Sequence, residues 1–334
     1  MASTTVGKTC VAASSLQFVA ANKRARLSAA PLRASPARVG LSRKTGPVCV
    51  FTPENPSKVN KTSNLPSWAP ESPTITRDRV RELEGLLDGG ESLYALSRFN
   101  NALRALPDDV DEVDRRMRAV WLELCFNLES FNPIFTAVLL KVQCTIGLSD
   151  YEKRDDALHN LIVPLGGEYG LAQDKPLGKT HRVLFAEFYE SCTGKPLTNL
   201  LGEGEHPVKA EWLFASMLRD VSNGGGAVEP MEQATYALGY NLAVEYLAAY
   251  EKGWMLDSFR ALSDKTLAKN GRNVDWTFLE VHAEGEPEHA DLGHNAVTCL
   301  VPAAHEDILR QAMLDHDRDF AIFYNYLADL LLDA

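Results

Sequence analysis

Apolar residues recur along most of the chain at the spacing of three and four residues that is typical of amphipathic α-helices. Glycine or proline stands at most boundaries between these periodic segments, and Pro133 and Pro230 occupy places where a first helical turn tolerates proline. The chain contains no alternating run typical of β-strands and no repeat of fixed period. The pattern therefore predicts an all-α fold, a multi-helical bundle whose helices span the height of one domain.

The helices predicted from this periodicity cover residues 76–87, 92–105, 108–128, 133–146, 150–165, 179–192, 207–221, 230–251, 256–262, 275–294 and 302–332. The last of them carries Leu309, Met313, His316 and Phe320 on one stripe. Such a stripe is typical of a helix face that packs in the core. His316 is therefore interpreted as a hydrogen-bonded core histidine rather than as a metal ligand.

The first fifty residues are predicted to be a targeting segment rather than part of the fold. Eight basic residues precede the first acidic residue, Glu54, and serine, threonine and alanine fill the gaps between them. This composition is typical of organelle transit peptides, and no apolar segment typical of a secretory signal is present. We expect residues 1–50 to be a disordered chloroplast transit peptide, with the mitochondrion as the alternative destination. Residues 51–74 are expected to form a Pro-rich extended segment, and residues 75–334 a single domain.

Removing those eight basic residues changes the formal net charge from −11 to −19, so the remaining chain is strongly acidic. This charge argues against nucleic acid as a partner. No stretch without Asp, Glu, Lys or Arg is longer than 14 residues, which is too short to cross a bilayer, so no transmembrane segment is expected. The cysteines outside the targeting segment are widely spaced and form no CxxC motif, which is typical of a protein in a reducing compartment.

Three side chains of metal-ligand type follow one another at helical spacing near the end of the chain. His282, Glu286 and His289 stand at i, i+4 and i+7, so a helix would direct all three to one face, beside Phe278. Imidazole and carboxylate together suit iron, manganese or zinc. A surface ion pair between Glu286 and His289 is the alternative interpretation, since ionisable clusters are often structural.

Further ligands for a metal site in a helical bundle must come from other helices, and three residues are candidates. Glu245 shares a helix face with apolar residues, where an unpaired carboxylate would destabilise the fold unless a cation or a partner satisfies it. His181 shares a face with Leu184 and Phe185. Glu168 follows a Pro- and Gly-rich segment that is expected to end the preceding helix and leave it in a loop. The alternatives are a helix-capping or arginine-paired role for Glu245, a core role for His181 and a solvated position for Glu168.

These residues occur in an order that resembles a known family. Asn160-Leu161, Glu168-x-Gly170, His181 before an aromatic helix, Gly239 with Glu245, and His282-xxx-Glu286-xx-His289 resemble the pattern of the haem-oxygenase-like diiron oxidases, also called iron-containing redox enzymes, over residues 159–294. The resemblance implies a haem-oxygenase-like bundle that binds two iron ions, or manganese, through Glu168, His181, Glu245, His282, Glu286 and His289. The sequence departs from that pattern in two ways: Glu286 stands where aspartate is frequent, and the interval between Glu168 and His181 is wider than expected.

Gly285 and Pro287 flank Glu286, and both residues weaken a helix. The sequence therefore predicts that this turn frays without metal, which matches the mobility that the resemblance implies for the corresponding helix. Folding of the turn would then be coupled to metal occupancy.

The resemblance implies an O2-activating non-haem diiron oxidoreductase. Members of the family oxidise amines at nitrogen, decarboxylate acids or cleave carbon–carbon bonds. The expected substrate is therefore a small carboxylate- or amine-bearing metabolite of the plastid, with O2 as co-substrate and ferredoxin as an external electron donor. The expected pocket residues are aromatic side chains near His181 and Glu245, namely Phe185, Phe188, Tyr240 and Tyr246.

Two other functions are compatible with parts of the pattern. A ferritin-like carboxylate bundle needs Glu-xx-His on two helices, and the only match besides Glu286-xx-His289 is Glu203-xx-His206, where a helix is not expected. The second is a metal-free haem-oxygenase-like binding or assembly protein with a tetrapyrrole or thiamin-type ligand. Haem oxygenase itself needs a proximal histidine near the start of its domain, and no histidine precedes His159.

Overall fold

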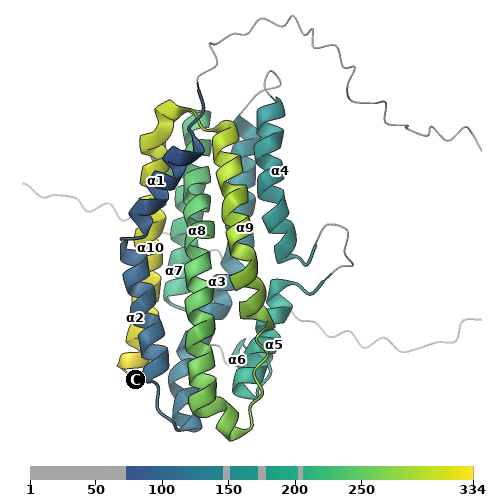
Figure 1. The fold of residues 1–334 in the computed structure, drawn as a ribbon, viewed down its shortest axis with the longest axis vertical. Coiled ribbons are helices and arrows are strands. Elements are labelled where there is room, and N and C mark those ends of the chain that lie inside the picture. Colours follow the sequence, from purple (N-terminus) through teal and green to yellow (C-terminus); the bar gives the residue numbers. More distant parts are fainter. Residues whose placement is uncertain (1–72, 146–150, 172–177, 202–205, 334) are drawn as a thin grey trace, which may run out of the picture. The chain divides into compact units, whose positions relative to one another are not determined.

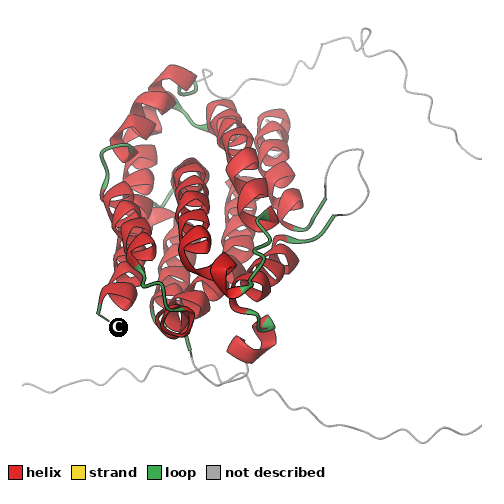
Figure 2. Ribbon diagram, turned by 60° about the horizontal axis from the view of Figure 1, so that its bottom comes forward, coloured by secondary structure: helices red, strands yellow, loops and turns green. Residues whose placement is uncertain are grey.

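The computed structural model describes residues 73–333, apart from 146–150, 172–177 and 202–205. The predicted transit peptide, residues 1–50, and the Pro-rich segment up to residue 72 lie outside the described residues. The described residues form one compact unit. Its described part is helical and contains no strand, and its one β-type backbone pairing is an isolated bridge between Thr74 and Pro302 (Figure 2). The prediction of an all-α bundle is confirmed.

The bundle is built around one long helix, α8 (Figure 1). Its helices are α1 (Arg77–Leu87), α2 (Glu91–Ala105), α3 (Val110–Thr145), α4 (Tyr151–Glu168), α5 (His181–Thr193), α6 (Leu197–Leu201), α7 (Lys209–Asn223), α8 (Pro230–Leu262), α9 (Thr277–Leu300) and α10 (Glu306–Leu332). α8 packs against α9, α10, α3 and α2. It has buried residues on every face, from Ala234 to Leu262, as a helix surrounded by other helices requires. None of the described helices combines the length and the apolar character needed to cross a membrane.

Two pairs of predicted helices are single helices in the structure. α3 continues through Pro133 and α8 continues through Gly253, so the breaks predicted at residues 129–132 and 252–255 are wrong. The apolar period continues across each break, because Ile134 and Phe135 are buried in α3 and Met255 is buried in α8. Burial of these side chains offsets the backbone hydrogen bond lost at proline and the low helix propensity of glycine. The short helix α6 is not among the predicted elements, since five residues are too few for a periodic pattern.

Buried carboxylates hold the N-terminal ends of two helices. Glu123 of α3 is 3% exposed and accepts hydrogen bonds from the backbone N–H groups of Val208 and Ala210, each at 2.6 Å, where α7 begins. Asp317 of α10 accepts hydrogen bonds from the backbone N–H groups of Glu91 (3.0 Å) and Ser92 (3.1 Å), where α2 begins. The first turn of a helix leaves such N–H groups without an intrahelical partner. These two buried acids therefore have structural roles.

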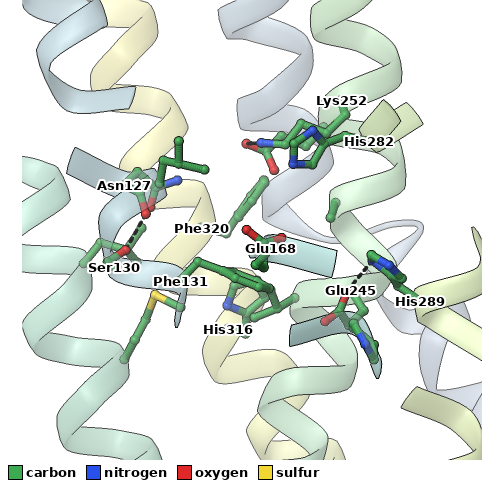
Figure 3. A pocket seen from close by; sticks show the side chains of 17 residues that line it. Asn127, Ser130, Phe131, Glu168, Glu245, Lys252, His282, His289, His316 and Phe320 are labelled. Carbon is green, nitrogen blue, oxygen red and sulfur yellow. Dashed lines mark hydrogen bonds and ion pairs between the residues drawn. The ribbon is translucent and has the colours of Figure 1, made fainter. Parts of the chain in front are cut away.

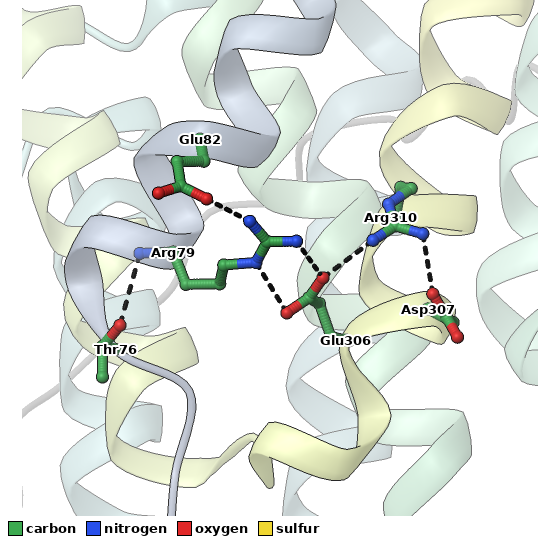
Figure 4. Close-up of polar contacts among 6 residues, drawn as sticks. All are labelled: Thr76, Arg79, Glu82, Glu306, Asp307 and Arg310. Carbon is green, nitrogen blue, oxygen red and sulfur yellow. Dashed lines mark hydrogen bonds and ion pairs between the residues drawn. The ribbon is translucent and has the colours of Figure 1, made fainter.

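An ion-pair network at the surface joins the first and last helices of the bundle (Figure 4). Glu306 at the start of α10 accepts hydrogen bonds from Nε of Arg79 in α1 (2.8 Å) and from Nη2 of Arg310 one turn later (2.7 Å). The hydrogen bond from Arg79 is the largest cause that lowers the pKa of the Glu306 carboxyl. Because these side chains are largely in contact with water, the network positions α1 more than it stabilises the fold.

Gly239 allows α8 and α10 to approach closely. A Cβ atom at this position would lie 2.7 Å from the backbone oxygen of Leu309 and 3.0 Å from Cβ of Ala312. Both distances are shorter than the normal separation of non-bonded atoms, so the two helices would have to move apart to accept a side chain. The space beside this glycine is therefore filled by α10.

Gly239→Ala is expected to lower the free energy of unfolding by about 1–3 kcal/mol, because the added methyl group separates α8 from α10. Gly253→Ala, in the same helix, is the matched control. No atom beyond its own helix backbone lies within 4 Å of the Cβ position at Gly253, so the helix propensity of alanine is expected to stabilise by up to about 1 kcal/mol. Urea unfolding followed by circular dichroism measures both changes, and equal effects would contradict a tight contact at Gly239.

Candidate metal centre

Glu168 is the last residue of α4, and only 9% of it is exposed. The prediction that it lies in a loop after a broken helix is wrong, because α4 continues through Pro164 and the two glycines that follow. Leu161 and Pro164 are buried seven and four residues before Glu168. Helical repetition therefore places the carboxylate on the same inward face.

A closed loop brings His181 to Glu168. The backbone N–H of Gly178 donates to the backbone oxygen of Gly170 at 2.8 Å, which joins the two ends of the connection between α4 and α5. His181 is the first residue of α5, and Thr180 caps that helix. As a result, Nδ1 of His181 lies 2.8 Å from Oε1 of Glu168. The wide interval in sequence is thus compatible with direct contact in space.

His282 of α9 completes a cluster of three donors. Donor atoms of Glu168, His181 and His282 all lie within 4.8 Å of one another, and the centroids of the two imidazole rings are 4.2 Å apart. Nδ1 of His282 lies 2.5 Å from the backbone oxygen of Phe278, and only a protonated Nδ1 can donate to that oxygen. This leaves Nε2 as the ring nitrogen for a metal, an arrangement that metal-bound histidines commonly have.

The charge state of His282 also suits a ligand. Burial of the ring lowers its pKa well below the ordinary value for histidine, and the nearby ammonium group of Lys252 lowers it further. The imidazole is therefore neutral at physiological pH. Only the neutral ring has a free lone pair for a metal ion.

Glu245 and His289 form a second pair of donors, between α8 and α9. Glu245 is 2% exposed, and its Oε2 lies 3.7 Å from Nδ1 of His289. Both side chains line the cavity that Glu168 and His282 also line (Figure 3). Five of the six residues that the resemblance assigns to a metal site are thus gathered in one region of the bundle.

The cavity extends from these donors to an apolar wall. The cavity volume that the centre of a water molecule can occupy is about 80 Å³. By the same measure one water needs roughly 10–15 Å³. The wall is formed by Phe131 of α3, Leu213 and Met217 of α7, and Phe320 of α10. The cavity therefore has room for a small molecule beside the donor groups.

Glu286 lies within α9, but its side chain lies outside the described residues, so its part in the cluster stays a prediction. The backbone of α9 is helical through Gly285 and Pro287. The helix packs against α8 and α4 along its length, which holds it in spite of these two residues. The coupling of this turn to metal occupancy also stays a prediction.

None of the four aromatic residues expected to form the pocket is among the described residues that line this cavity, so their part in substrate binding stays a prediction. Phe185 and Phe188 pack with Trp121, at 6.3 and 5.6 Å between ring centroids. They also contact Phe278, whose ring supports His282 at 4.6 Å.

The two tyrosines among these four residues, Tyr240 and Tyr246, donate hydrogen bonds to aspartates. The hydroxyl of Tyr240 donates to Asp319 at 3.2 Å, and that of Tyr246 donates to Asp88 at 2.6 Å. Aromatic character in a sequence identifies core residues, but it does not tell which of them face a cavity.

Several polar residues of the cavity wall were not expected from the sequence, and they include Glu251, Lys252 and His316. Nζ of Lys252 lies 3.0 Å from Oε1 of Glu251, so their charges are paired. His316 is buried as expected, but the prediction that it is hydrogen-bonded is wrong, since among the described residues neither ring nitrogen has a partner. A histidine in an apolar stripe gives no sign in the sequence of which surroundings its nitrogens meet.

The donor set fits a metal ion of the iron, manganese or zinc type. Two carboxylates and three imidazoles reach one interior region from four helices, and mixed nitrogen and oxygen donors are typical of such metals rather than of calcium or magnesium. His282 has the orienting hydrogen bond that a metal-bound histidine needs. The site therefore could hold a metal without rearrangement of the helices.

Comparisons with known proteins support the fold only. No protein-family model and no curated protein matches the chain. The solved structures that match include two of a CADD-like protein of unknown function from Nostoc punctiforme, at 14% sequence identity. One match has a TM-score of 0.54 and covers 77% of this chain and 95% of that chain; the other has a TM-score of 0.49 and covers 72% and 97%. This chain therefore has the helical fold of that protein.

Gly170→Ala is expected to weaken metal binding by more than roughly tenfold, because it displaces Glu168 from His181. Gly170 has a φ of 74°, which disfavours a side chain, and its Cβ would lie 2.5 Å from the backbone oxygen of Gly178. Gly167→Ala is the control, since its Cβ position has no neighbour within 4 Å. Titration with Co2+, followed by its visible absorption, measures the affinities. Equal affinities of the two variants would contradict the role of the closed loop.

Proposed function

We propose that this chain is an O2-activating non-haem diiron oxidase that acts on a small carboxylate- or amine-bearing metabolite in the plastid. The observation that carries the proposal is the convergence of Glu168, His181 and His282, whose donor atoms lie within 4.8 Å of one another. Glu245 and His289 line the same cavity. The resemblance of the motif order to haem-oxygenase-like diiron oxidases supports the same function, and the fold shared with the CADD-like protein is compatible with it.

The donor groups come from separate helices, which favours a rigid site. Glu168 ends α4, His181 begins α5, Glu245 lies on α8, and His282 and His289 lie on α9. Two iron ions bound by such a set supply the redox chemistry that reduces O2. The protein's own task is to fix these side chains, which it does through the closed loop at Gly170 and the hydrogen bond from His282 to Phe278.

The cavity beside the donors gives the substrate a place to bind. Its apolar wall keeps bulk water away from the reacting atoms, which limits side reactions. Lys252 places an ammonium group on the same wall, two helical turns beyond Glu245 on α8. The ammonium group has three N–H donors, so it can donate to a substrate carboxylate as well as to Glu251, and this supports the choice of a carboxylate-bearing substrate.

Location and electron supply belong to the same proposal. The basic, acid-free N-terminal segment supports import into the chloroplast, with the mitochondrion as the alternative. Electrons that O2 takes up beyond those given by the substrate would come from an external donor, and ferredoxin is a suitable one in a plastid. The strongly acidic chain supports a small-molecule substrate rather than nucleic acid.

Anaerobic loading with ferrous iron is expected to give close to two irons per chain, measured by mass spectrometry after removal of free metal. Glu245→Gln is expected to weaken iron binding by more than roughly tenfold, because an amide is a poorer ligand than a carboxylate. Glu284→Gln is the matched control, since Glu284 is exposed on α9. If the wild-type chain binds no iron, the oxidase proposal fails and a metal-free binding or assembly protein is the better explanation.

Exposure of the iron-loaded chain to O2 is expected to produce a transient visible absorbance in a stopped-flow spectrometer. The signal should reach its maximum at two equivalents of iron, because both ions take part in the reduction of O2. It should be lost in Glu245→Gln and kept in Glu284→Gln. A flat spectrum at two equivalents would argue against the proposed reaction even if iron is bound.

A further inference from the structure

His316 occupies an unusual position on α10. It is 2% exposed, it lines the cavity, and within the described part of the chain neither of its ring nitrogens has a hydrogen-bond partner. Its ring packs against the rings of Tyr240 and Phe320, with distances of 4.9 and 5.6 Å between ring centroids. Figure 3 shows the ring beside Phe131, on the side of the cavity away from Lys252.

The obvious internal partner is already in use. The hydroxyl of Tyr240, next to the imidazole, donates to Asp319 at 3.2 Å. On the α3 wall the hydroxyl of Ser130 donates to the backbone oxygen of Asn127 at 2.6 Å. A buried imidazole without partners costs folding free energy, and a leucine in the same stripe would avoid that cost. The cost is offset if a ligand in the cavity supplies the missing hydrogen bonds.

We propose that His316 is a substrate-binding residue that hydrogen-bonds a hydroxyl group of a small ligand whose apolar body lies against the cavity wall. The inference rests on the proposed function, because the ligand is taken to be the substrate that lies next to the metal donors. It also narrows the substrate class to molecules that combine a hydroxyl group with an aromatic or short aliphatic body.

The chemistry of the ring selects the hydroxyl. Burial lowers the pKa of His316 to about 3, so the ring is neutral and presents one donor and one acceptor. A hydroxyl group both donates and accepts, so it can pair with whichever ring nitrogen faces the cavity in either tautomer, whereas a carboxylate only accepts and an ammonium only donates. Phe131, Met217 and Phe320 supply the apolar surface for the rest of the molecule.

His316 and Lys252 lie at opposite ends of the cavity (Figure 3). His316 contacts Tyr240 on α8, whereas Lys252 lies about three turns further along the same helix. A ligand between them would have its hydroxyl group at His316 and its acidic group toward Lys252. In Figure 3, Glu168 lies between His316 and Lys252, and Glu245 and His289 line the same cavity. A ligand that spans the two ends would therefore pass a metal donor.

Phenol and toluene test the inference, because they share one shape and differ in a single hydroxyl. Calorimetry would measure both affinities for the full chain, first free of metal and then with Zn2+ in place of iron. The ratio of phenol affinity to toluene affinity is expected to fall by roughly tenfold in His316→Leu. Phenol loses its hydrogen bond to the imidazole, and toluene no longer leaves a buried imidazole without a partner. His316→Gln, which keeps a donor and an acceptor, should restore most of the ratio.

Phe320→Leu is the control for the apolar wall. It should change the affinities for phenol and toluene by similar factors and leave their ratio unchanged. Circular dichroism and thermal unfolding would show that each variant is folded.

An unchanged ratio in His316→Leu would overturn the inference, because it would mean that a bound water or the protein alone satisfies the imidazole. Failure of the wild-type chain to bind either probe would overturn it as well. The metal-free arm keeps these outcomes separate from those of iron loading. If the chain binds two irons but the phenol-to-toluene ratio does not depend on His316, only the inference about His316 fails. If the ratio depends on His316 but the chain binds no iron, the oxidase proposal fails.

Discussion

Burial of a carboxylate on the central helix is the constraint on which the rest of this structure depends. Glu245 is 2% exposed on α8, and the neighbouring helices on all sides prevent α8 from turning it to water. An ionised acid in such surroundings costs several kcal/mol unless a cation or hydrogen-bond donor faces it. α9 supplies His289 as a partner, with Nδ1 3.7 Å from Oε2 of Glu245. The two helices lie close together at Gly293, where an added Cβ would be 3.1 Å from Cδ1 of Leu242. The donor cluster is therefore a requirement of the packing as well as a candidate site.

Four of the buried acids of this bundle differ in their partners. Glu123 and Asp317 accept hydrogen bonds from backbone N–H groups at helix N-termini, so their charge is satisfied by the fold itself. Glu168 and Glu245 line a cavity and face imidazoles instead. A helix end is a permanent partner, whereas an imidazole at a cavity is also a metal ligand. Burial alone therefore does not separate these two pairs of acids, but the partner and the cavity together do.

Periodicity predicted the helical class and most helix positions, because the apolar face of each helix is fixed by burial. It failed at Pro133 and Gly253, where packing of the neighbouring residues overrides the local preference of one residue. Glu168 was identified as a candidate but assigned to a loop, since the burial of Pro164 cannot be known before the fold. The cavity wall was the least predictable part. Phe185 and Phe131 are equally apolar in sequence, and only the arrangement of α3, α5 and α10 decides which of them faces the cavity.

Part of the cavity wall comes from helices that carry no donor. The described donors lie between Glu168 and His289, within the range over which the motif order resembles diiron oxidases. α8 contributes to the wall as well as to the donors, but α3, α7 and α10 line the cavity without supplying a donor. Changes on these three helices can therefore alter the shape and polarity of the ligand without moving a donor group. For this reason the motif can indicate a metal centre but not a substrate, and some of the residues that select the substrate lie outside the motif, as His316 does on α10.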